Sequence, residues 1–142
     1  MKKKIYLAAP LFNEQERIYN KSIKNLLTSR YEVYLPQEDG LLLKNLLDQG
    51  VALSIAERKI FSADIAAMEN CDILLAILDG AHIDEGVAFE IGYMYALDKK
   101  CIGIQTDIRR QLPSGNNPMI SMSLDKIFDN AEDVVHWLEG LA

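Results

Sequence analysis

The unbroken apolar run ILLAIL, which follows Asp72, constrains the fold more than any other feature of this sequence. A run of this length without polar alternation is typical of a strand that is buried on both faces, as the strands of a parallel sheet are. We therefore predict a strand over residues 72–78. Other short apolar runs alternate along the chain with segments of helical periodicity, which is the pattern of consecutive βαβ units. The sequence predicts a doubly wound α/β fold.

The remaining predicted elements follow the same alternation. Strands are expected at residues 5–9, 32–35 and 101–106, with a possible edge strand at 126–128. Helices are expected at residues 13–28, 54–70, 84–97 and 131–141. Ser54 is a plausible N-cap of the second helix, with Glu57 three residues later as in a capping box. Residues 37–50 and 117–124 are left without an assigned element, and we expect a single domain over residues 1–142.

Composition and charge exclude several classes of protein. Apolar residues make up 49% of the chain and charged residues 25%, so neither a disordered nor a fibrous protein is expected. The net charge of −6 disfavours nucleic acid polymers as partners, because a polyanion-binding surface needs an excess of basic residues. The two cysteines, Cys71 and Cys101, form no CxxC motif, which favours a reduced, cytoplasmic protein without a structural zinc site.

The first residues, MKKKIYLAAPLF, admit two interpretations. Three lysines before an apolar stretch resemble a signal peptide, but that stretch spans only residues 5–12 and contains Pro10. We favour a buried first strand. No run of about eighteen apolar residues occurs anywhere, so no membrane partner is expected.

Several familiar catalytic motifs are missing from the sequence. It contains no GxGxxG or GxxxxGK[ST] phosphate loop, and no HExxH or GxSxG motif. The two histidines, His82 and His136, offer little for a metal site or a catalytic triad, and we interpret each as structural or solvated. If this chain is an enzyme, its carboxylates are expected to do the chemistry.

Glu90 is the single charged residue in the segment GVAFEIGYMYAL, residues 86–97. A helix that is apolar all round is expected to be buried, so this carboxylate would lie within protein. Burying an unpaired carboxylate costs several kcal/mol. We interpret Glu90 as a functional carboxylate, with a structural glutamate bonded to a neighbour as the alternative. Tyr6, in the first strand, needs a partner for its hydroxyl, and Glu90 is a candidate.

Two aspartates carry weaker signals. Asp64 falls on the helix face that also holds Ile60 and Met68, whereas an exposed aspartate would lie with the charged residues, so functional and structural roles both stay open. Asp84 precedes a helix, where aspartate commonly acts as N-cap. It also follows a central strand, and in a doubly wound sheet the ligand lies beyond the carboxyl ends of the strands. Both interpretations of Asp84 remain open.

Three segments of the chain carry a family resemblance: KKIYLAAPLF, SADIAAMENCDILLAILDG and, above all, DEGVAFEIGYMYAL. The spacing from Asp64 through Asp72 and Asp84 to Glu90 resembles the pattern of the nucleoside 2-deoxyribosyltransferase family and of its relatives that hydrolyse deoxynucleoside monophosphates. The segment Asn117-Pro118-Met119 is similar to a late Asn-x-Met segment of that family. The resemblance covers roughly residues 3–124.

The resemblance implies a flavodoxin-like, five-stranded parallel sheet. It also implies that Glu90 is the catalytic nucleophile, that Tyr6 holds this glutamate, and that Asp64 handles the proton on the base. The reaction would be transfer of 2-deoxyribose between nucleobases, in which a carboxylate attacks C1′ as in retaining glycosidases. No metal or cofactor is required.

The resemblance further assigns substrate binding to Asp84 and Asn117, which correspond to residues that contact the sugar hydroxyls, the asparagine from the neighbouring subunit. Gly86 of the motif and Gln37 complete the substrate-binding set. The implied partners are nucleosides, nucleobases and a second copy of the chain, in a homodimer or a multiple of dimers.

Two other functions remain open at this point. The first is an N-glycosidase that hydrolyses nucleosides or deoxynucleoside 5′-monophosphates, and the second is a non-catalytic nucleotide-binding module. Between the two kinds of substrate, the sequence favours a free nucleoside. Asp84 and Glu85 lie in the first turn of a predicted helix, where they would oppose the binding of a phosphate.

Overall fold

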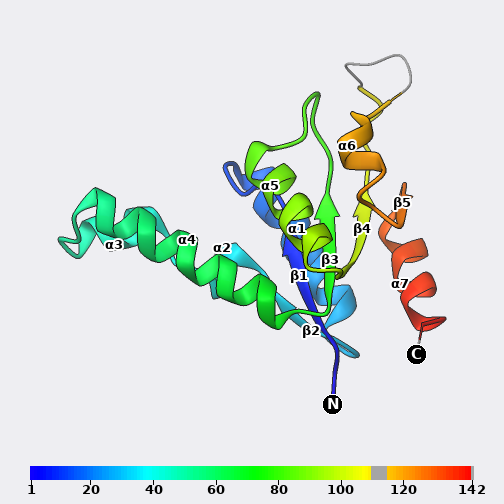
Figure 1. The fold of residues 1–142 in the computed structure, drawn as a ribbon, viewed down its shortest axis with the longest axis horizontal. Coiled ribbons are helices and arrows are strands. Elements are labelled where there is room, and N and C mark those ends of the chain that lie inside the picture. Colours follow the sequence, from blue (N-terminus) through cyan, green and yellow to red (C-terminus); the bar gives the residue numbers. More distant parts are fainter. Residues whose placement is uncertain (110–114, 142) are drawn as a thin grey trace.

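The computed structural model describes residues 1–109 and 115–141, which contain a five-stranded parallel sheet (Figure 1). The strands are β1 (Lys4–Ala8), β2 (Glu32–Tyr34), β3 (Ile73–Ile77), β4 (Lys100–Ile104) and β5 (Lys126–Phe128). They lie in the order β2-β1-β3-β4-β5, and every neighbouring pair is parallel. The predicted flavodoxin-like α/β fold is confirmed.

The helices among the described residues are α1 (Glu14–Leu27), α2 (Pro36–Asp39), α3 (Leu43–Asp48), α4 (Leu53–Asn70), α5 (Glu85–Ala96), α6 (Pro118–Ser121) and α7 (Ala131–Glu139). The four predicted helices are confirmed to within two residues at each end. Residues 37–50, for which the sequence predicts no element, contribute to α2 and form α3. The fourth strand is shorter than predicted and ends at Ile104.

The side chains of β1 alternate between the two faces of the sheet. Ile5 and Leu7 belong to the core that α1 and α7 cover, whereas Tyr6 and Ala8 belong to the core beneath α4 and α5. This alternation is the normal consequence of the two-residue period of a strand. It directs the hydroxyl of Tyr6 towards the α4–α5 side of the molecule.

The N-cap of α4 differs from the prediction. Ser54 is not the N-cap, because the helix begins at Leu53 after Ala52 and no side chain caps it. The chain turns between α3 and α4 at Gly50, whose φ of +85° suits glycine. That turn is complete before Ser54, which therefore lies inside the first helical turn instead of ahead of it. Glu57 accordingly forms no capping box with Ser54.

In Figure 1, α3 and the adjoining half of α4 extend away from the sheet as an arm. The two helices of the arm pack on each other. Its surface carries large exposed apolar side chains, which are Leu42, Leu43, Leu47, Leu53 and Ile55. Although α4 has 18 residues, neither it nor another helix in the described ranges is long and apolar enough to cross a membrane.

The helix α5 is less buried than its sequence predicts. One face packs on the sheet, but the side chains of Phe89 and Tyr95 are 50% and 59% exposed. The Phe89 ring contacts the rings of Phe61 and Tyr93, at centroid distances of 6.2 and 6.1 Å. Within a single chain α5 is therefore not buried on all sides, and that expectation is wrong, because a sheet covers only one side of a helix.

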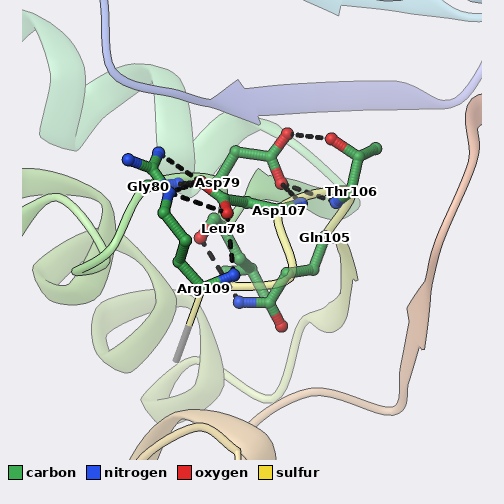
Figure 2. A network of polar contacts seen from close by, with 7 residues as sticks. All are labelled: Leu78, Asp79, Gly80, Gln105, Thr106, Asp107 and Arg109. Carbon is green, nitrogen blue, oxygen red and sulfur yellow. Dashed lines mark hydrogen bonds and ion pairs between the residues drawn. The ribbon is translucent and has the colours of Figure 1, made fainter. Parts of the chain in front are cut away.

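Polar residues that follow β3 and β4 hold the two loops together (Figure 2). The carboxylate of Asp79 accepts the backbone N–H of Thr106 at 2.6 Å and that of Asp107 at 3.1 Å. Asp107 accepts the N–H of Gly80 at 3.2 Å and binds Arg109, whose guanidinium lowers the pKa of the Asp107 carboxyl. Because these groups bond to one another, we assign the polar contacts at the carboxyl ends of β3 and β4 a structural role.

Candidate active site

A cavity of about 600 Å³ lies beyond the carboxyl ends of β1 and β2, between the base of the arm and α5. This is the end of a doubly wound sheet at which ligands bind. The cavity brings together four of the predicted site residues, which are Asp64, Asp84, Gly86 and Glu90. A fifth, Tyr6, lies fully buried in the adjoining core.

Glu90 is held at the wall of the cavity by a partly buried hydrogen bond. The hydroxyl of Tyr6 donates to Oε2 of Glu90, so the predicted contact between these two residues is confirmed. Burial raises the pKa of Glu90 to about 7, and the charges of Asp64 and Asp84 also raise it, while the bond from Tyr6 lowers it. A carboxyl group with this pKa is present both as an acid and as a carboxylate near neutral pH.

Asp64 reaches the same cavity from α4. Its Oδ1 accepts a hydrogen bond from the hydroxyl of Tyr34, at 3.2 Å. Burial raises the pKa of Asp64, and the bond from Tyr34 lowers it. Tyr34 is a residue that sequence reasoning missed. Tyr34 lies beside Tyr6 in the parallel register of β1 and β2, which the sequence of β2 alone does not reveal.

Asp84 is the N-cap of α5, which confirms one of its two interpretations. Its Oδ2 accepts the backbone N–H of Gly86 at 3.0 Å and that of Val87 at 3.1 Å. A Cβ added at Gly86 would lie 3.1 Å from this oxygen, so a larger residue there would make a tight steric contact with the capping carboxylate. The carboxylate therefore occupies two of the N–H groups that the start of α5 offers to an anion.

Two predicted substrate-binding residues lie elsewhere in this chain. Asn117 caps α6 by accepting the N–H of Met119 at 2.9 Å, and it lines a separate cavity of about 470 Å³. Gln37 accepts a hydrogen bond from Asn20 and donates one to the carbonyl of Arg17, so its side chain is engaged with α1. Neither residue lines the cavity that contains Glu90.

The lining of the larger cavity combines carboxylates with apolar side chains. Among the residues that the structure describes, its charged members are Glu57, Asp64, Asp84 and Glu90, and no lysine or arginine joins them. Aromatic and aliphatic side chains, with Phe12, Phe61 and Phe89 the largest, form much of the remaining wall. Such a cavity fits a neutral ligand with flat apolar faces and a few polar groups. In the described ranges, no group of histidine, cysteine and acidic residues is arranged to hold a metal ion.

Comparison with known proteins gives a family match and several similar structures. The family model described as nucleoside 2-deoxyribosyltransferase matches residues 5–129. A conserved protein from Enterococcus faecalis V583 has a similar structure, with a TM-score of 0.81 and 25% identity over all of both chains. No curated protein gave a sequence match.

Two further structures are similar to this chain. The 2-deoxyribosyltransferase of Bacillus psychrosaccharolyticus aligns with a TM-score of 0.75 and 27% identity, over 92% of this chain and 89% of the other. The CMP N-glycosidase BcmB of Clostridium botulinum shares the fold, with a TM-score of 0.57 and 19% identity over 96% of this chain and 99% of its own. The family model covers most of the chain, and this chain therefore belongs to the nucleoside 2-deoxyribosyltransferase family.

Proposed function

We propose that this protein transfers 2-deoxyribose between nucleobases through a covalent intermediate on Glu90. One observation carries the proposal: the carboxyl groups of Glu90 and Asp64 line a single cavity, and each is held by a tyrosine hydroxyl. Membership of a nucleoside-processing family supports it. So does the similarity to the Bacillus 2-deoxyribosyltransferase.

In the first step, the Glu90 carboxylate attacks C1′ of a 2′-deoxynucleoside. The bond between C1′ and the base nitrogen breaks, its electron pair stays on the base, and Asp64 as an acid donates the proton that neutralises the leaving base. The bond from Tyr6 fixes Oε2 of Glu90. Among the described residues Oε1 of Glu90 accepts no hydrogen bond, which leaves it for the attack on C1′.

In the second step, a different base attacks C1′ of the glycosyl ester. The ester bond breaks and returns the electron pair to Glu90, while Asp64, now a carboxylate, takes the proton that the incoming base nitrogen loses. Water in place of the base gives hydrolysis as a side reaction. The pKa of Glu90, about 7, leaves a substantial fraction of the nucleophile ionised at neutral pH.

The proposed substrate is a neutral nucleoside with a free 5′-hydroxyl. The N–H groups of Gly86 and Val87 already donate to Asp84 and are not available to a phosphate. The carboxylate of Asp84 would also repel it. A sugar hydroxyl, in contrast, can donate a hydrogen bond to that carboxylate. The four acidic side chains of the cavity also disfavour a negatively charged ligand.

The proposed active species is a homodimer or a multiple of dimers in which Asn117 completes a neighbour's site. Within its own chain, Asn117 is exposed and lies outside the cavity of Glu90. The apolar surface of the arm, and the exposed rings of Phe61 and Phe89, support association with a second copy.

The proposal is tested by incubating the protein with deoxyinosine and adenine and separating the products by chromatography. New deoxyadenosine together with hypoxanthine shows transfer. Free hypoxanthine and free 2-deoxyribose without deoxyadenosine indicate the N-glycosidase, a reaction also named for the Clostridium structure of the same fold. Unchanged deoxyinosine supports a binding module and refutes the proposal.

A further inference from the structure

Tyr34 bonds to one of the two carboxyl groups of the cavity wall and stacks on the tyrosine that bonds to the other. Its ring stacks on the ring of Tyr6, with centroids 5.3 Å apart and an interplanar angle of 19°. Its hydroxyl donates to Oδ1 of Asp64, while the hydroxyl of Tyr6 donates to Oε2 of Glu90. Two stacked tyrosines from adjacent strands therefore each hold one carboxyl group, and the stack sets how these two groups lie relative to each other.

The turn after α2 covers the contact between Tyr34 and Asp64. A Cβ added at Gly40 would lie 3.2 Å from the Tyr34 hydroxyl, 3.3 Å from Oδ1 of Asp64 and 2.7 Å from the carbonyl oxygen of Pro36. The backbone thus approaches the pair as closely as glycine permits. The carboxylate of Asp39 accepts the backbone N–H of Leu35 at 2.8 Å and forms an ion pair with Lys24 at 3.0 Å. The hydrogen bond from Tyr34 is therefore partly buried, with the backbone of Gly40 close to it on one side.

We propose that Tyr34 is a positioning residue that aims the proton of Asp64 at the leaving base. This inference rests on the proposed function. Because Oδ1 accepts the bond from Tyr34, the proton of the carboxylic acid resides on Oδ2. Among the described residues Oδ2 accepts no hydrogen bond, so it is available to the base that occupies the cavity. Tyr34 touches neither base nor sugar in this role, and it acts only through Asp64.

The surroundings of Asp64 agree with this role. The titratable groups near it are Tyr34 on β2, Tyr6 on β1 and Glu90 on α5. The same cavity also contains Asp84, at the start of α5, and Glu57, which lies about two turns earlier on the same face of α4. The bond from Tyr34 favours the ionised form of Asp64 and lowers its pKa against the effect of burial. Burial and the charge of Asp64 raise the pKa of Tyr34, so this tyrosine stays protonated and remains a donor.

The variant Tyr34→Phe tests the proposal, because it keeps the stacked ring and removes only the hydroxyl. We expect kcat for deoxyadenosine, whose base leaves with a proton, to fall about tenfold. With 4-nitrophenyl 2-deoxyribofuranoside, whose nitrophenolate leaves without a proton, the rate should change less than about twofold. The ¹³C carboxyl signal of Asp64 should titrate at higher pH in the variant than in the wild type, since a bond to the ionised form is lost.

The matched control is Tyr93→Phe. The hydroxyl of Tyr93 donates to Glu69 at 2.6 Å, which is also a tyrosine–carboxylate contact between α4 and a neighbouring element, but outside the cavity. We expect this variant to react with both substrates at the wild-type rate and to leave the titration of Asp64 unchanged.

Equal losses with both substrates in Tyr34→Phe would show that the tyrosine merely maintains the structure, and the proposal would be wrong. Unaltered rates with an unaltered Asp64 titration would overturn it as well. If the wild type turns over neither substrate, the proposed function fails. The titration of Asp64 still decides whether Tyr34 controls that carboxyl group, so the two failures are distinguishable.

Discussion

The hydroxyl of Tyr6, in the middle of β1, donates a hydrogen bond to the carboxyl group of Glu90 in α5, 84 residues further along the chain. Tyr6 is fully buried, so the donor is fixed before any ligand arrives. A donor that is oriented by the fold needs no reorganisation when charge changes on its partner. The bond therefore both fixes the orientation of Glu90 and moderates the rise in its pKa that burial causes.

We predict that Glu90→Gln folds normally and loses nearly all turnover, on the order of a thousandfold or more. Glutamine has almost the same shape and can still accept the bond from Tyr6, but its amide is a very poor nucleophile. Circular dichroism checks the fold, and chromatography of nucleoside and base checks turnover. A variant that reacts at the wild-type rate would exclude Glu90 as the nucleophile.

The raised pKa of Glu90 predicts how the stability of the protein depends on pH. Burial raises this pKa from 4.5 to about 7, so the folded state binds more protons than the unfolded state between these values. The contribution of Glu90 to the free energy of unfolding is therefore fully present below about pH 4.5 and is lost as pH rises through 7. Glu90→Gln lacks this dependence. The free energy of unfolding of the variant, measured with urea and compared with that of the wild type, should therefore rise by about 1–3 kcal/mol from pH 4 to pH 8. An equal difference at both pH values would contradict the raised pKa.

We expect Asp64→Asn to slow deoxyadenosine turnover about a hundredfold, because asparagine cannot give a proton to the leaving base. The same variant should retain most of its activity with 4-nitrophenyl 2-deoxyribofuranoside. The ratio of the two rates, measured in wild type and variant, isolates proton transfer from binding. If both substrates slow equally, Asp64 does not supply the proton.

The parts of the fold that the sequence predicted well are those with strong local patterns. The apolar run of β3 is buried along its whole length. Glu90, the single charge in residues 86–97, lines the cavity. Residues 37–50 were not predictable in this way, since α2 and α3 have only 4 and 6 residues and show too little periodicity. The N-cap of α4 was assigned wrongly, because the helix begins at Leu53, soon after the turn at Gly50, and Ser54 lies within its first turn.

The candidate site was only partly predictable for a similar reason. Glu90 and Asp64 stood out as charges on apolar helix faces, and the contact from Tyr6 followed from its need for a partner. Tyr34 carried no such signal, because β2 has 3 residues and its last tyrosine resembles an ordinary strand residue. Its importance depends on which strand lies next to β1, and the sequence of a single strand does not contain that information.

A shared site predicts that two inactive variants restore each other. In a mixture of Glu90→Gln and Asn117→Ala chains, a hybrid dimer contains one site with both an intact Glu90 and an intact Asn117. We expect up to about a quarter of the wild-type activity after subunits exchange, since about half of the dimers are hybrids with one working site each. Subunit exchange is verified with differently tagged chains. No recovery after verified exchange would place Asn117 outside the partner's site.

The cap at the start of α5 predicts that the wild type prefers a nucleoside to its 5′-monophosphate. A phosphate charge about 4 Å from Asp84, at an effective dielectric constant near 20, would be opposed by about 4 kcal/mol. Half of that value already weakens binding more than tenfold. We therefore expect kcat/KM for deoxyadenosine to exceed that for its 5′-monophosphate by at least about tenfold.

Asp84→Ser should reduce the preference for deoxyadenosine over its 5′-monophosphate. Serine still caps the helix, but it carries no charge and leaves room for a phosphate beside the N–H groups of Gly86 and Val87. The matched control is Glu85→Gln, which removes a neighbouring charge in the same turn that does not line the cavity. It should leave the preference nearly unchanged, since an exposed charge is screened by water and salt. A wild type that prefers the monophosphate would contradict the role of Asp84 and would favour the nucleotide N-glycosidase. Equal changes in both variants would attribute the preference to net charge and not to the cap.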